Sequence, residues 1–178
     1  MSNITAIVAD SNPLTADEFR SEENVSRIDE TLSEVLGMML GHECHPDGSE
    51  TPLAGPKVKI DDKTAIVGYA GKIRGACEIR MHNEGALAVA TAMLGSIPSE
   101  DDKESYMCDA VGELCNMVAG GWKNRVPTLE ASCSLAPPTV ISGHDYRVHT
   151  NPSVVTITRR YEFSGHHMSV TLLYDTAA

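Results

Sequence analysis

The chain has 178 residues, of which 42% are hydrophobic, enough for one sizeable core and a single domain. Its formal net charge of −11 repels a phosphate backbone, and no cluster of Lys and Arg offsets this charge, so we expect no nucleic-acid partner. No stretch approaches the roughly 20 apolar residues of a membrane span, and the N-terminus lacks a secretory pattern, so we expect a cytoplasmic protein without membrane contact.

The first long segment with helical periodicity follows an acidic beginning. Residues 1–24 are interrupted by Asn12-Pro13, and we expect a lead-in that is either loosely ordered or short, ahead of one domain over residues 25–178. Apolar residues then recur at three- and four-residue intervals from 26 to 41, and Ser26 with Asp29 is a candidate N-cap pair. This pattern predicts an amphipathic helix.

The middle of the chain predicts a connection, strands and a short helix. Residues 42–55 are rich in Pro, Gly and Asp and are typical of a connection. Strands are predicted over 57–60, 64–69 and 74–81, and a helix of small residues over 83–94.

The second half of the chain again predicts a long helix followed by strands. A long amphipathic helix is predicted over 104–125, and strands over 130–135, 148–151, 154–163 and 166–173, the last two joined as a hairpin across Ser164-Gly165. The fold class is therefore α/β (α+β), with a largely antiparallel sheet packed by two long helices and a shorter one.

An internal repeat supports this organisation. Residues 30–41 align with residues 109–120 without a gap and share the pattern E-x-x-[G/N]-M-x-x-G. Either two amphipathic helices coincide by chance, or the fold is a pseudo-twofold duplication. In the duplication, Gly37 occupies the position of Asn116.

The second long helix has two different faces. At about 100° per residue, one side carries apolar residues and the other carries Asp109, Glu113, Asn116 and Gly120. Asn and Gly weaken a helix interior, glycine by roughly 1 kcal/mol relative to alanine. Either a partner approaches this face closely, or it is a solvated face and Gly120-Gly121 allow two elements to pack.

Two segments carry a resemblance to a known family. Residues 110–120, with the E-x-x-N motif, and residues 136–145, with the sequence P-P-T-V-I-S-G, resemble the chemotaxis phosphatases CheX, CheC and FliY, and CheX most closely. The resemblance covers most of residues 26–175. It implies that Glu113 and Asn116 form the active site. Because Gly37 replaces the first Asn, one motif is intact, as in CheX-type members, and Glu34 alone is not expected to form a second site.

The resemblance also implies a substrate and a mechanism. The substrate is the aspartyl phosphate of a CheY-like receiver domain, which supplies its own Mg²⁺ and lysine, so no cofactor or metal of this protein is expected. Asn116 orients a water molecule, and Glu113 binds the receiver's lysine. Asp109, Met117 and Gly120 line the docking surface, although simple packing also explains Met117 and Gly120. A homodimer with sheets joined across strand edges is implied as well.

Other interpretations of the sequence remain open. A CheX-like module that docks a receiver without hydrolysis is the main alternative, followed by a structural role in a flagellar switch, for which the chain lacks an additional domain. His42-Glu-Cys-His45 contains three zinc-ligand types but no distant pair to complete a site. His144 and His166-His167 are interpreted as structural. We expect reduced, mostly buried thiols from the cysteines, which are Cys44, Cys77, Cys108, Cys115 and Cys133.

Overall fold

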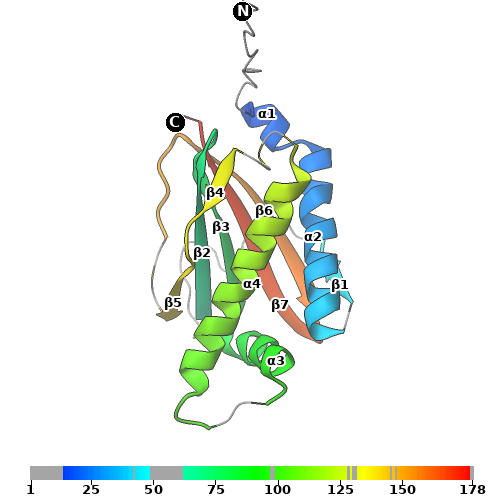
Figure 1. The fold of residues 1–178 in the computed structure, drawn as a ribbon, viewed down its shortest axis with the longest axis vertical. Coiled ribbons are helices and arrows are strands. Elements are labelled where there is room, and N and C mark those ends of the chain that lie inside the picture. The colour runs from blue at the N-terminus through cyan, green and yellow to red at the C-terminus, as the bar shows by residue number, and fades with distance from the viewer. Residues whose placement is uncertain are drawn as a thin grey trace, which may run out of the picture.

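The computed structural model describes residues 14–41, 43–48, 62–96, 99–127, 129, 132–144, 146 and 148–176. Within this part of the chain the helices are α1 (Ala16–Phe19), α2 (Glu22–Leu40), α3 (Asn83–Leu94) and α4 (Lys103–Arg125). The strands are β1 (Cys44–Pro46), β2 (Asp62–Gly71), β3 (Gly75–His82), β4 (Cys133–Leu135), β5 (Thr139–Gly143), β6 (Val154–Phe163) and β7 (His166–Asp175). The long helices lie side by side on one face of a single sheet (Figure 1).

The sheet has the order expected of a duplication. Its described strands run β1-β6-β7-β3-β2-β4, with β5 also paired to β2, and every pairing is antiparallel. The central pair, β3 and β7, ends the two halves of the chain, and each half places its first strand on the edge of the other half's sheet. This exchange of strands relates the two halves, and with them α2 and α4, by a pseudo-twofold axis.

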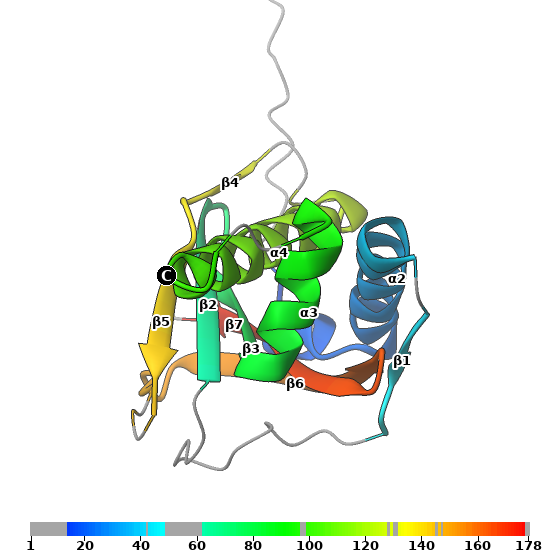
Figure 2. The same cartoon turned by 90° about the horizontal axis from the view of Figure 1, so that it is seen from below.

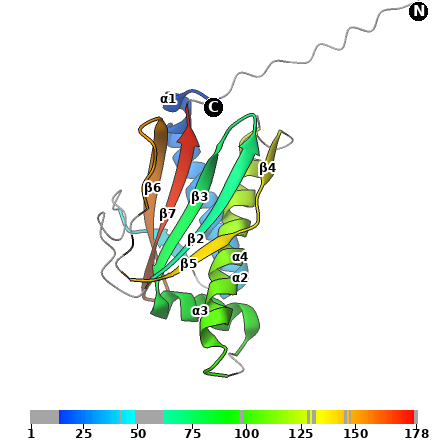
Figure 3. The ribbon, with the colours of Figure 1, turned by 90° about the vertical axis from the view of Figure 1, so that its left-hand side faces the viewer.

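Only one face of the sheet is covered by helices. Seen end-on, α2, α3 and α4 all lie on the same side (Figure 2), and Figure 3 shows the opposite face without a helix in the described part of the chain. Apolar residues of alternating strand positions therefore point toward the helices and form the core. This arrangement leaves the outer side of α4 facing away from the sheet.

An aromatic cluster fixes the C-terminal end of α4. The indole of Trp122 lies between Phe19 of α1 and Tyr69 of β2, with ring centroids 6.2 and 5.7 Å away. Phe19 is fully buried. Residues 14–24, expected as a lead-in, thus hold α1, the Ser21 cap and the start of α2.

The predicted hairpin between β6 and β7 is confirmed. Ser164 and Gly165 have φ of 50° and 78° and connect paired residues Phe163 and His166. Positive φ at both central positions gives the turn whose twist matches that of the flanking strands. The predicted helix over 83–94 and the predicted strand over 154–163 also match the structure residue for residue.

Several sequence predictions were wrong. The strand predicted over 148–151 is a loop, where Val148 is exposed rather than packed. Strand β5 was not predicted, because its exposed edge position hides the usual alternation. The short strand β1 lies in the predicted connection, and the strand predicted over 57–60 lies outside the described residues.

The first long helix also begins earlier than predicted. Its N-cap is Ser21, whose hydroxyl accepts the backbone N–H of Asn24, and not Ser26. The Asn24 side chain is buried and donates to the Phe19 carbonyl at 2.9 Å. A buried polar residue at this position interrupts the apolar periodicity that was used to place the helix start.

Candidate functional site

The predicted two-faced character of α4 is confirmed. The core side is fully buried at Val111, Leu114 and Cys115, and Cys115 Sγ is 3.6 Å from the Ala65 carbonyl oxygen, turned away from the opposite face. On that opposite face Asp109 and Glu113 are exposed, and Asn116, Met117 and Gly120 are half-buried. The structure thus brings the predicted site residues together along one accessible side of the helix.

The polar groups of Glu113 and Asn116 are available to a partner. Among the residues that the structure describes, neither the Glu113 carboxylate nor the Asn116 amide has a side-chain hydrogen bond or an ion pair. Residues three apart on a helix are neighbours, so the two groups project side by side. The two carboxylate oxygens of Glu113, which accept hydrogen bonds, and the amide group of Asn116, which can donate them, therefore lie together on one helix.

A buried lysine fixes the N-terminal end of α4. The side chain of Lys63 is 1% exposed, and its Nζ lies 2.7 Å from Asn83 Oδ1, 2.9 Å from Ser142 Oγ and 2.9 Å from Glu104 Oε1. Glu104 also accepts a hydrogen bond from Ser142, and these donors lower the pKa of its carboxyl. One cation thus ties β2, the start of α3, β5 and the first turn of α4.

Sequence reasoning did not identify Lys63, although a signal was present. Lys63 is in phase with Ala65 and Val67, which face the core, so period-two alternation places its side chain inward. A lysine at an inward position requires acceptors, since burying an unpaired charge is costly. The acceptors come from segments distant in sequence, and only the fold reveals them.

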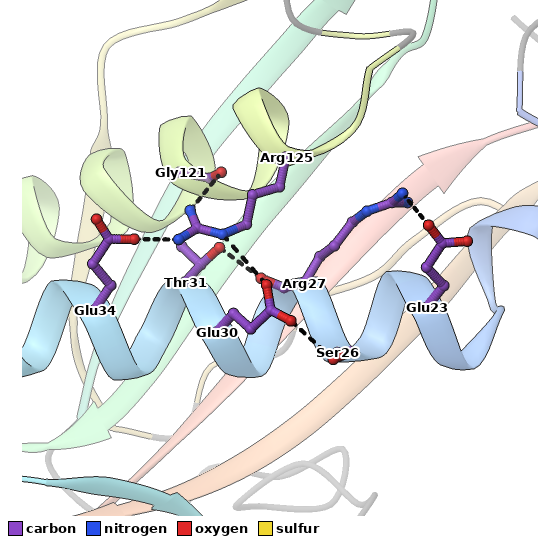
Figure 4. A network of polar contacts seen from close by, with 8 residues as sticks. All are labelled: Glu23, Ser26, Arg27, Glu30, Thr31, Glu34, Gly121 and Arg125. Carbon is purple, nitrogen blue, oxygen red and sulfur yellow. Dashed lines mark hydrogen bonds and ion pairs between the residues drawn. The ribbon is translucent and has the colours of Figure 1, made fainter.

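A second ionic network fixes the C-terminal end of α4 (Figure 4). The Arg125 guanidinium pairs with Glu34 of α2, lies 3.8 Å from Glu30, and donates at 3.3 Å to the Gly121 carbonyl. Glu34 is the repeat counterpart of Glu113. The first copy of the motif therefore carries an ion-paired carboxylate and Gly37. At the same positions α4 carries Asn116 and a carboxylate that no described residue pairs with.

The neighbouring glycines of α4 have different environments. A β-carbon at position 121 would lie 2.6 Å from Thr31 Cγ2, so Gly121 allows α2 and α4 to approach. A β-carbon at position 120 would lie 3.7 Å from Leu135 Cδ1, an ordinary contact distance. The packing interpretation thus holds for Gly121, whereas packing does not require glycine at position 120.

The described residues offer no alternative metal or thiol chemistry. Within them, no group of three His, Cys, Asp or Glu side chains is arranged to hold a metal; His42 of the candidate zinc motif lies outside them. Every cysteine is free; Cys108 is half-buried and the other four are buried. Burial raises the pKa of the Cys44 thiol to about 12, which disfavours a reactive thiolate.

None of the described helices is both long and apolar enough to cross a bilayer.

Comparisons with known proteins match this architecture. Residues 63–159, more than half of the chain, match the family model of the chemotaxis phosphatase CheX. The CheY-P phosphatase CheX of Thermotoga maritima is 32% identical over 83 residues, which are 47% of this chain and 53% of that protein. The chain therefore spans about half the length of this curated relative in the match.

Solved structures extend the match to most of the chain. The chemotaxis protein CheX of Desulfovibrio desulfuricans is similar with a TM-score of 0.71 at 25% identity, over 85% of this chain and 99% of that chain. A chain of the CheX–CheY–BeF3–Mg²⁺ complex of Borrelia burgdorferi is similar with a TM-score of 0.60 at 23% identity, over 85% and 97% of the two chains. The second likeness concerns the fold alone.

Proposed function

Because the chain belongs to the CheX family of chemotaxis phosphatases, we propose that it hydrolyses the aspartyl phosphate of a CheY-like receiver domain. The observation that carries this proposal is the Glu113 and Asn116 pair on the accessible side of α4, whose polar groups have no side-chain partner among the described residues. The T. maritima relative is a CheY-P phosphatase, and the B. burgdorferi relative forms a complex with CheY, which supports a receiver as the partner.

The reaction requires positioning rather than a strong base. A water oxygen attacks phosphorus, and the bond between phosphorus and the aspartyl oxygen breaks to leave a carboxylate and inorganic phosphate. An acyl phosphate is already reactive, and the receiver's own Mg²⁺ offsets the charge of the phosphoryl oxygens. The enzyme therefore needs no cofactor or metal of its own for this step.

Asn116 is the residue that positions the water. Its carbonyl oxygen accepts a hydrogen bond from the water, and its amide donates to a phosphoryl oxygen, so one side chain aligns both reactants. A neutral amide does not repel the phosphoryl group, unlike a carboxylate at the same position. The half-buried location of Asn116 limits the orientations of its side chain.

Glu113 and its neighbours set the docking register. The Glu113 carboxylate forms a charge-assisted hydrogen bond with the receiver's active-site lysine. Asp109, one turn earlier on α4, adds negative charge on the same side, while Met117 and Gly120 contribute an adaptable apolar contact and close approach. By family membership we also infer that the protein is cytoplasmic and forms a homodimer. Sedimentation analysis tests the homodimer.

The test compares hydrolysis with binding. A CheY-like receiver from the same organism is phosphorylated, and the loss of its phosphoryl group is followed with Mg²⁺, with and without the protein. Acceleration supports the phosphatase. Binding of the receiver without acceleration supports instead the second candidate, a docking module that has kept the CheX fold.

A further inference from the structure

An extended segment lies along the outer flank of α4. It comprises β4, residues 136–138 and β5, and it runs antiparallel to the helix. Neighbours at four positions of α4 define its course, in order from the C-terminal end of the helix. Lys123 Nζ lies 3.2 Å from the Cys133 carbonyl oxygen, and a β-carbon at position 120 would lie 3.7 Å from Leu135 Cδ1. A β-carbon at position 112 would lie 3.3 Å from Val140 Cγ2 and 3.5 Å from Pro138 Cβ, and Ser142 Oγ donates to Glu104.

These contacts place the segment beside Asn116. On α4, Asn116 lies midway between Gly120, where an added β-carbon would meet Leu135, and Gly112, where it would meet Pro138. At 100° per residue, Asn116 is turned by about 40° from Gly112 and lies one turn further along the same flank. The part of the segment next to Asn116 is therefore Ala136 and Pro137.

This part of the segment is an exposed and rigid ridge. Residues 136–139, Ala-Pro-Pro-Thr, which we call the proline ridge, are all exposed. The Ala136 N–H donates to the Gly68 carbonyl at 2.8 Å, and from Thr139 onward the chain pairs with β2. Two consecutive prolines fix φ between these anchors. The ridge thus presents an uncharged surface at little cost in conformational entropy.

The chemistry of the two surfaces is complementary to one kind of partner. On α4, Asp109 and Glu113 attract a cation, whereas the adjacent proline ridge carries no charge. A partner surface that fits both α4 and the proline ridge has a lysine next to an apolar, uncharged rim. The rim around an acyl phosphate has to exclude bulk water while it admits the attacking water.

We propose that the proline ridge is the second half of the docking surface, and that Pro137 contacts the rim of the phosphorylated receiver beside its aspartyl phosphate. This inference rests on the proposed function. It makes the ridge a determinant of receiver specificity, because it selects the side chains around the phosphorylation site, whereas Asn116 and Glu113 contact groups that every receiver has in common.

The test uses charge insertion on the ridge. Pro137→Glu places a carboxylate on the uncharged surface. Thr139→Glu is a matched control in the same segment, because Thr139 alternates with Val140 and its side chain points to the helix-free face of the sheet. Thr156→Glu places a carboxylate on that face at a distant strand as a second control. Dissociation constants are measured by calorimetry for the receiver with Mg²⁺ and beryllium trifluoride, a phosphoryl analogue, and KM and kcat for the phosphorylated receiver. Thermal unfolding confirms that each variant is folded.

The proposal predicts that Pro137→Glu weakens binding and raises KM by about tenfold, with kcat nearly unchanged, and that both controls stay within about twofold of wild type. Wild-type affinity and KM in Pro137→Glu would overturn the role of the ridge and leave the phosphatase intact. If the wild-type protein binds the receiver without accelerating its decay, the proposed function fails, while the dissociation constants still decide whether the ridge is part of the docking surface.

Discussion

Arg125, in the last turn of α4, forms an ion pair with Glu34 of α2, the residue that stands where α4 has Glu113. The same acidic position of the duplicated motif therefore has two different roles. In α2 the carboxylate joins the two long helices, and in α4 it is exposed and has no ion pair within the described part of the chain. This divergence explains how a pseudo-twofold fold presents a single candidate site.

Removal of the Arg125 guanidinium should weaken the contact between α2 and α4. Both partners are partly exposed, so we expect Arg125→Ala to lower the free energy of unfolding by about 1 kcal/mol, measured in urea. A double-mutant cycle with Glu34→Gln should give a coupling energy that decreases as salt rises. Glu113→Gln, which removes a free carboxylate, is the control and should leave stability unchanged; a loss as large as that of Arg125→Ala would contradict the assigned roles.

The adjacent glycines of α4 should respond in opposite directions to the same substitution. Gly121→Ala forces a β-carbon against the stiff, buried Thr31 side chain and should destabilise the fold by about 1–3 kcal/mol. Gly120→Ala has room for the methyl group and should stabilise the fold by up to about 1 kcal/mol through helix propensity. Equal effects in denaturant titrations would show that helix propensity alone decides both.

The ion pair between Lys63 and Glu104 should make the stability of the fold sensitive to acid. Hydrogen bonds from Ser142 and Lys63 lower the pKa of Glu104 in the folded state. A depressed pKa stabilises the fold above the unfolded value of about 4.3, and this contribution is lost as the pH falls through the lower folded value. Stability should therefore fall less steeply below about pH 4.3 in Glu104→Gln than in wild type. Identical slopes in the two proteins would show that this ion pair does not contribute.

Glu113 should act through its charge. If its carboxylate binds a lysine of the receiver, Glu113→Gln raises KM for the phosphorylated receiver, and added salt reduces the difference from wild type. Steady-state kinetics at low and high ionic strength measure this. Asp17→Gln, an acidic position on α1 away from the α4 surface, is a control with no expected effect. A salt-independent loss in Glu113→Gln would point to a structural role.

The helices and the duplication were predictable because they depend on local periodicity. The boundaries of α3 and β6 and the two faces of α4 follow from apolar spacing, and the repeat was visible in the alignment of residues 30–41 with residues 109–120. A short edge strand such as β5 has no such pattern, since its side chains are mostly exposed or half-buried and two prolines precede it. The sequence pattern therefore predicted no strand there.

Contacts between distant segments were not predictable in the same way. The acceptors of Lys63 come from α3, α4 and β5, and the ion pair of Arg125 joins residues 91 positions apart. The motif with Glu113 and Asn116 predicted the candidate site, but the proline ridge comes to lie beside it only through the course of the chain around α4. Long-range packing, rather than composition, determines these relationships.

The most direct test of the central claim is the decay of a phosphorylated CheY-like receiver with Asn116→Ala, because this residue is proposed to position the water. Asn124→Ala, the same substitution at an exposed position on the same helix, is the matched control. We predict that wild type and Asn124→Ala accelerate the decay, while Asn116→Ala loses about 100-fold or more of the acceleration and still binds the receiver. Undiminished acceleration by Asn116→Ala would contradict the account.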